Sequence, residues 1–142
     1  MKQAVMLSIR GRQSYQDQEP EVIELVTEGV MEQVDGGWNI SYEESDLTGL
    51  GGVITTFRVD PDRIILSRTG KLNSQMIFQE GMTHDSLYQA DFGALMISVM
   101  ATKISTDVTP KGGVIDLEYK IEIEQSAMGT IDYHLDIKPK TE

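Results

Sequence analysis

The chain has 142 residues and no cysteine, and its 23 acidic residues against 12 basic ones give a formal net charge of −11 at pH 7. This length and composition are typical of one folded domain with one core. The lack of cysteine excludes a disulfide framework and a thiol nucleophile, and the negative charge disfavours nucleic acid and anionic membranes as partners.

The sequence also bears on the compartment. No apolar run approaches the roughly 20 residues that a membrane-spanning helix needs. The apolar run at 4–7 is interrupted by Ser8 and Arg10, so it is shorter than the ~7–15 apolar residues of a signal peptide. We therefore expect a cytoplasmic protein.

Turn signals recur at short intervals and separate short apolar segments. Asp35-Gly36 is typical of a tight β-hairpin, and Asp60-Pro61-Asp62 is typical of a type I turn. Further turns are predicted at 49–52, 70–73, 110–113 and 127–129. Strands are predicted over 3–15, 37–44, 52–59, 63–69, 74–80 and 82–90.

Two segments, 20–34 and 92–104, fit a helix and a strand equally well. In the first, valines recur every four residues, a spacing that suits both the 3.6-residue period of a helix and the two-residue period of a strand. Gly29 and the β-branched valines disfavour a helix there. In the second, apolar residues share one helical face, while 97–99 suits a strand equally. The pattern alone leaves both structures open.

The clearest strands lie near the C-terminus, where apolar and polar residues alternate over 115–124 and again over 131–137. This alternation indicates a sheet with one wet face, and the predicted turn at 127–129 would join the two segments as a hairpin. The apolar faces comprise Ile115, Leu117, Tyr119, Ile121 and Ile123, then Ile131, Tyr133, Leu135 and Ile137.

Together these segments predict an all-β fold. We expect a single antiparallel up-and-down β-barrel of about eight to ten strands, with residues 1–142 as one domain. A barrel of this size either fills its interior with side chains or holds one small ligand.

Several short motifs occur in a set order between Leu7 and Ile137. They are Glu21-Val22-Ile23-Glu24 with Gly29, Ile40-Ser41-Tyr42-Glu43-Glu44 with Asp46-Leu47, Thr56 with Val59, Arg68-Thr69-Gly70, Phe78 with Gly81, Tyr88 with Phe92-Gly93, and Ile104-Ser105. In their order and spacing the chain resembles a family of small bacterial proteins typified by YwiB, a domain of unknown function described as a calycin-like, lipocalin-like β-barrel. The resemblance implies that 20–34 and 92–104 are strands, and it implies no activity. The glycine-rich stretch at 49–52 is longer than the family's usual turn.

Candidate site residues are polar side chains that share the inward parity of their strand, because small barrels bind ligands inside or at the mouth. Arg68 shares the parity of the apolar residues in 63–69, and a buried arginine needs an acid or an anionic ligand beside it. Tyr42 and Glu44 share the inward parity of 37–44. We favour exposure of Arg68 and Glu44 at the strand ends, with a buried pair or a ligand site as alternatives.

A second candidate strip lies on 82–90, where Tyr88 and His84 share parity with Ser86. If this face is inward, the strip would orient a ligand or support acid–base chemistry. We favour the alternative, in which Leu87 faces the core and the strip faces solvent.

No motif points to a metal or a cofactor. Asp132, His134 and Asp136 share one face and are a conceivable divalent site, but a solvated acidic face is favoured. Gly70-Lys71 lacks the flanking residues of a phosphate loop. We predict no catalytic residue, no metal site and no cofactor.

Three functions follow from these features. The first is a binding protein for a small apolar or amphipathic ligand, with Arg68, Tyr42, Glu44, Tyr88 and His84 as candidate contacts. The second is a scaffold that self-associates as a homodimer or docks a partner. The third is a small hydrolase that uses His84 with a nearby carboxylate, and we favour an enzyme less than a non-catalytic protein.

Overall fold

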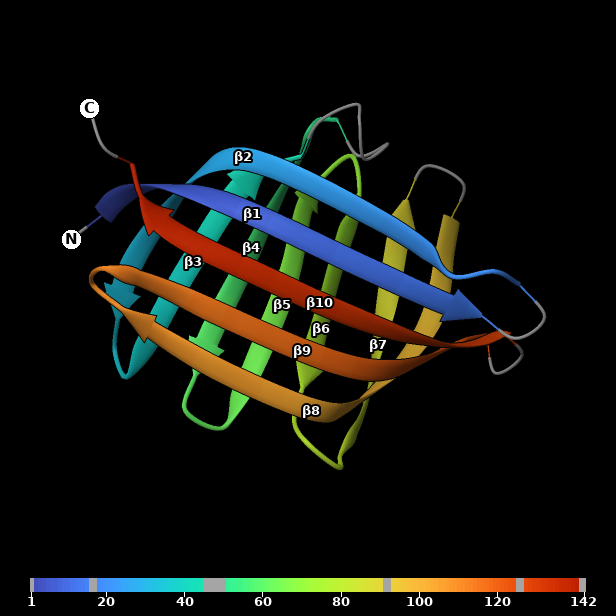
Figure 1. Cartoon of the computed structure of the whole chain (residues 1–142). Helices are drawn as coiled ribbons and strands as arrows, with labels where there is room; N and C mark the ends of the chain where they lie inside the picture. The colour runs from blue at the N-terminus through green and yellow to red at the C-terminus, as the bar shows by residue number, and fades with distance from the viewer. Residues whose placement is uncertain (1, 16–17, 45–50, 91–92, 125–126, 141–142) are drawn as a thin grey trace.

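The computed structural model describes residues 2–15, 18–44, 51–90, 93–124 and 127–140. Ten strands form one closed antiparallel barrel, in which each strand pairs with the next along the chain and β1 closes the ring with β10 (Figure 1). The predicted all-β up-and-down barrel is therefore confirmed. Within the described ranges, no helix is long and apolar enough to cross a membrane.

The strands fall into a long and a short group. The long strands curve across the near side of the barrel in Figure 1, and the short strands stand behind them. The long group comprises β1 (Lys2–Tyr15), β2 (Glu21–Val34), β8 (Gly93–Thr109), β9 (Gly112–Ile123) and β10 (Ala127–Pro139). The short group comprises β3 (Gly37–Glu43), β4 (Val53–Asp60), β5 (Arg63–Gly70), β6 (Asn73–Phe78) and β7 (Thr83–Ala90).

Both segments that the pattern left open are strands, as the family resemblance implied. Residues 21–32 of β2 pair with β1, and β8 pairs with β7 on one edge and β9 on the other. The valines spaced four apart in β2 lie on the outer face, where Val26 is 69% exposed. Inter-strand hydrogen bonding decides between two structures that the spacing alone could not separate.

The turn between β9 and β10 precedes its predicted position, so the prediction of a turn over 127–129 is wrong. Ala127 already pairs with Ile123, and Gly129 lies within β10. A Cβ atom on Gly129 would lie 2.6 Å from the ring of Tyr15. This glycine therefore permits close packing against an aromatic ring and does not mark a turn.

Other turn predictions have mixed outcomes. Asp35-Gly36 forms the two-residue connection between β2 and β3, with Gly36 at a φ of 75°, which is the left-handed conformation that favours glycine. Residues 49–50 of the predicted turn at 49–52, together with the motif residues Asp46-Leu47 and Phe92, lie outside the described residues.

The hydrophobic core fills one half of the barrel, near the turns that follow β2, β4 and β6. It is built from the inward-facing residues at that end of each strand, and burying each such side chain contributes about 1.5–3 kcal/mol. Its largest fully buried members include Leu7, Met31, Ile40, Phe57, Ile64, Leu66, Phe78, Ile115 and Leu135.

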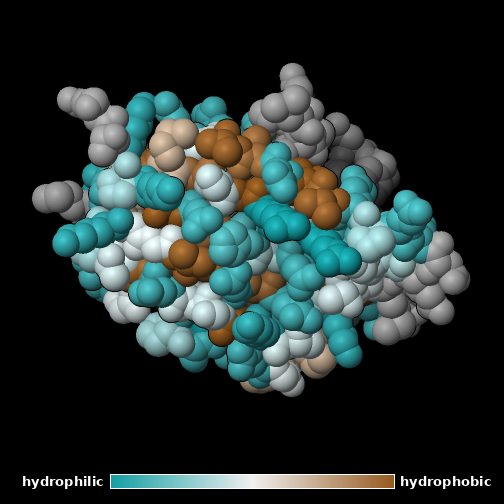
Figure 2. All heavy atoms as spheres, viewed as in Figure 1, coloured by the Kyte–Doolittle hydropathy of each residue, from teal (hydrophilic) through white to brown (hydrophobic). Residues whose placement is uncertain are grey.

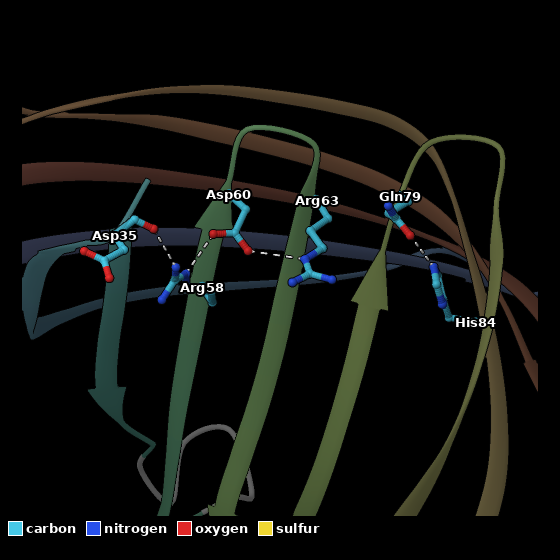
Figure 3. A network of polar contacts seen from close by, with 6 residues as sticks. All are labelled: Asp35, Arg58, Asp60, Arg63, Gln79 and His84. Carbon is cyan, nitrogen blue, oxygen red and sulfur yellow. Dashed lines mark hydrogen bonds and ion pairs between the residues drawn. The ribbon is translucent and has the colours of Figure 1, made fainter. Parts of the chain in front are cut away.

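Polar contacts join the turns at this filled end (Figure 3). Arg58 donates to the Asp60 carboxylate at 2.8 Å and to the backbone oxygen of Asp35 at 3.0 Å. Arg63 contacts the other carboxylate oxygen of Asp60 at 3.3 Å. The hydrogen bond from Arg58, more than any other interaction, holds the pKa of Asp60 below its usual value. The network ties the β2–β3 connection to the β4–β5 turn.

Candidate binding cavity

The other half of the barrel is hollow. It contains a cavity of about 450 Å³ with a predominantly apolar lining. Ile23, Leu95 and Ile123 belong to that lining, and Ile23 is 39% exposed. The cavity therefore reaches solvent beside β2, at the end opposite the filled core.

A row of directly paired polar side chains crosses five neighbouring strands in this half of the barrel. Each residue is directly opposite the next on the neighbouring strand, so the row runs without interruption from β3 to β7. We call this set the polar row: Tyr42, Thr55, Arg68, Ser74 and Tyr88. All five have inward parity, and Tyr42, Arg68 and Tyr88 line the cavity.

Arg68 is the cationic member of the polar row. Burial opposes its charge, but Tyr133, Tyr42 and Glu44 together raise the pKa of Arg68 above its usual value. Its guanidinium hydrogen-bonds to the hydroxyl of Tyr133. Its Nε atom is buried and has no hydrogen-bond partner within the described residues. Arg68 is therefore charged, largely buried and only partly satisfied by the protein.

Glu44 supplies the opposite charge beside the polar row and is only 7% exposed. Its carboxylate accepts a 2.6 Å hydrogen bond from the Thr55 hydroxyl and another from Tyr42. Burial, reinforced by Tyr133 and Glu44, raises the pKa of Tyr42 far above its usual value. Tyr42 therefore stays protonated at neutral pH and remains a donor to this carboxylate.

The opposite wall contributes two further tyrosines, Tyr133 on β10 and Tyr119 on β9. Their rings pack on the filled core, with centroids 6.0 Å from Phe57 and 4.4 Å from Phe78 respectively. Burial raises the pKa of both hydroxyls. These rings form the boundary between the filled and hollow halves of the barrel.

The structure brings Arg68, Tyr42 and Glu44 together, so the favoured prediction that Arg68 and Glu44 point to solvent is wrong. The long strands extend past the level of the polar row and enclose residues that sit near the ends of β3 and β5. Strand parity also places Tyr119 and Tyr133 inward, on faces that the sequence pattern assigns to the core. The overlooked signal was a phenol on an inward apolar face.

The prediction for β7 is also corrected. Tyr88 lines the cavity, whereas Leu87 is 48% exposed and lies opposite Met96, which is 42% exposed. His84 shares the inward parity but sits toward the filled end, where its Nε2 atom lies 2.7 Å from the Gln79 amide oxygen (Figure 3). His84 is not among the described residues that line the cavity, so it is separated from the other candidates.

On the outer face, a hollow of about 320 Å³ is lined by charged residues of both signs. His134 lies here between Asp116 on β9 and Asp136 on its own strand. The hydrogen bond with Asp116, followed by that with Asp136, raises the pKa of His134. Within the described residues, no three histidine, aspartate or glutamate side chains are arranged so that they could hold a metal ion. The imidazole thus serves as a partner for surface carboxylates.

The fold and the cavity define a closed β-barrel protein with one hollow half. The sequence profile described as a domain of unknown function, DUF1934, matches residues 7–137, and the chain belongs to this family. The fold is similar to the crystal structure of the ywiB protein from Bacillus subtilis, with a TM-score of 0.84 and 21% sequence identity over 99% of this chain and 94% of that one. No curated protein matches the chain.

Proposed function

We propose that the barrel binds one small amphipathic molecule in its hollow half. One observation carries the proposal: a cavity of about 450 Å³ with a mainly apolar lining contains the charged side chain of Arg68, whose Nε atom lacks a partner in the described residues. Ligand pockets in proteins typically measure roughly 300–1,000 Å³ and combine apolar walls with a few placed polar groups.

Packing energetics support the same proposal. Protein interiors are normally close-packed, and side chains that line a void lose the dispersion contacts that neighbouring atoms would supply. Ile121 and Ile131 face this void although the same strands pack tightly at the other end. An apolar ligand would restore those contacts, while the polar row would set its orientation.

Gly11 offers a direct test. It lines the cavity from β1, and a Cβ atom added there would meet no other atom within 4 Å. The variant Gly11→Leu should therefore occupy the cavity without disturbing the backbone. Ser8→Leu is the matched control, because Ser8 lies on the outer face of the same strand.

The measurement is a titration with the neutral dye phenylnaphthylamine, which fluoresces in apolar surroundings. We expect saturable binding of one dye per chain, weakened about tenfold or more by Gly11→Leu and unchanged by Ser8→Leu. Absence of saturable binding to the wild-type protein, or equal binding by Gly11→Leu, would overturn the proposal.

A scaffold that self-associates is the second candidate, and one observation favours it. Apolar side chains gather along β2 on an otherwise largely hydrophilic face (Figure 2). They include Val22, Val26 and Val30, which are 45%, 69% and 40% exposed. A dimer in light scattering that Val26→Thr dissociates, together with no dye binding, would favour this candidate. The hydrolase hypothesis has no such support, because His84 contacts an amide group in place of a carboxylate.

A further inference from the structure

We infer that the ligand of this cavity carries a carboxylate head group, which is held on Arg68 and Tyr133 with its apolar tail directed toward the mouth. The inference rests on the proposed function and specifies its ligand class. It is drawn from the charge of Arg68, which lines the cavity, and from the hydrogen-bonding capacity that the protein leaves unused in the wall beside it.

The unused capacity on Arg68 is a donor. A guanidinium has N–H donors and no acceptor, and the Nε atom of Arg68 is buried without a partner in the described residues. Because arginine only donates, Tyr133 must accept in the hydrogen bond between the two. The hydroxyl proton of Tyr133 is then left to donate to another group.

A hydroxyl without a partner lies beside Arg68. Ser74 is directly opposite Arg68 in the polar row, and its Oγ atom is buried with no hydrogen-bond partner in the described part of the chain. A buried polar group without a partner costs roughly 1–3 kcal/mol. Both atoms have almost no exposed surface, so a ligand acceptor would pair with them after a small shift of the Arg68 and Ser74 side chains, and this pairing would remove the cost.

The anionic group of the cavity, in contrast, is already used. Glu44 accepts hydrogen bonds from Thr55 and Tyr42. An ammonium head group would have to displace these donors and would lie in the field of Arg68. A carboxylate would lie in the field of Glu44, but it would meet the N–H donors of Arg68 and displace no hydrogen bond of Glu44. The cavity therefore complements an acceptor with negative charge better than a cation, despite the net charge of −11.

The positions of the two kinds of lining residue set the direction of the ligand. Arg68 and Tyr133 lie at the boundary with the filled core, where the Tyr133 ring packs on Phe57. Ile23 and Leu95 lie toward the mouth. A carboxylate at the boundary layer therefore places an alkyl tail along isoleucine and leucine side chains.

The test compares three ligands with the same tail by isothermal titration calorimetry on the full chain: decanoate, decanol and decylammonium. We expect decanoate to bind at least tenfold more tightly than the other two, because a hydrogen bond to a charged partner is stronger than one between neutral groups. Decanol or decylammonium binding as tightly as decanoate would overturn this inference and leave the proposed function standing. Failure of all three to bind would overturn both.

Two variants assign the contact. Arg68→Gln should weaken decanoate binding about tenfold or more and leave decanol binding within about twofold. Tyr133→Phe keeps the ring that packs on the core and should weaken decanoate alone by a smaller factor. Arg63→Gln, on an exposed arginine at the opposite end, should change nothing. Decanoate binding that survives both cavity substitutions would overturn the assignment, and thermal unfolding of each variant shows whether it is folded.

Discussion

Arg68 and Tyr133 hydrogen-bond across the interior of the barrel, and the bond joins β5 to β10, which lie on opposite sides of the ring of strands. Between this bond and the turns that follow β2, β4 and β6, the barrel is filled by aliphatic and aromatic side chains. The cavity lies on the other side of the bond. Polar contacts hold the two walls together at the level where apolar packing ends.

The charges of Arg68 and Glu44 should contribute to the stability of the fold as a pair. Arg68→Met should lower the free energy of unfolding by about 2 kcal/mol or more, because it leaves the nearly buried Glu44 without the cation that it interacts with. The double variant Arg68→Met/Glu44→Gln should recover most of that loss. Urea denaturation of the two variants measures the coupling, and a double variant no more stable than the single one would contradict it.

Alkaline pH should destabilise the fold through the buried tyrosines. Burial raises the pKa of Tyr42, Tyr119 and Tyr133, whereas tyrosine in an unfolded chain ionises near pH 10. Their stabilising contribution is therefore complete below about pH 10 and declines as pH rises further, because the unfolded state then loses protons that the folded state keeps.

Two measurements between about pH 8 and pH 11 test this dependence. Denaturant unfolding gives the stability at each pH, and phenolate absorbance gives the ionisation of the tyrosines in the folded protein. Tyr42→Phe should reduce the steepness of the decline, because it removes one of the ionising groups. Phenolate formation by these three residues in the folded protein near pH 10, with no loss of stability, would contradict the expectation.

His134 should stabilise the protein at acidic pH. Hydrogen bonding to Asp116 and Asp136 raises the pKa of His134 in the folded state. Its contribution is present below the unfolded pKa of about 6.5 and is lost as pH rises through the folded value. The side chain is 43% exposed, so solvent screening limits the effect to roughly 0.5 kcal/mol. His134→Asn should therefore lower stability at about pH 5 and leave it unchanged at about pH 9, and an equal loss at both values would refute this role.

Two glycines should lose very different amounts of stability on the same substitution. Gly112 has a φ of 103°, and an added Cβ atom would lie 2.2 Å from the backbone oxygen of Ile137. Gly112→Ala should therefore cost about 2 kcal/mol or more through backbone strain and steric overlap. Gly11→Ala has open space and should cost less than about 1 kcal/mol. Chemical denaturation compares the two, and similar losses would contradict the geometry.

Replacing a buried leucine and an exposed leucine by alanine should likewise cost very different amounts of stability. Leu66 is fully buried in the core, whereas Leu87 is 48% exposed on the outer face. Leu66→Ala should cost about 2–5 kcal/mol, and Leu87→Ala should change stability by about 0.5 kcal/mol or less. A large loss on substituting Leu87 would show that β7 presents the opposite face to the core.

Much of the fold was predictable because the signal is local. The alternation over 115–124 and 131–137 places Leu117 and Leu135 inside without any knowledge of neighbouring strands, and both are buried. The segments 20–34 and 92–104 lacked such a signal. A four-residue spacing satisfies both a helix and a strand, so hydrogen bonding to adjacent strands decided them.

The candidate site was predictable only in part. Parity gave Arg68 and Tyr42 the inward direction correctly, but it could not show whether the end of a strand is covered by other strands. On β7 neither face is clearly apolar, so parity could not choose between Leu87 and Tyr88. His84 has the same parity as Tyr88 and still lies apart from the cavity, because distance along the barrel axis separates them.

The sequence alone determined which side chains can share a face, because that property depends on the two-residue period of a single extended strand. Only the tertiary structure decided which of those faces meet, because the register between strands depends on pairing partners that lie far apart in the chain. The direct opposition of Arg68 to Thr55 on one side and Ser74 on the other is a consequence of two such registers. The cavity exists because long strands enclose that level of the barrel while the core fills the other end.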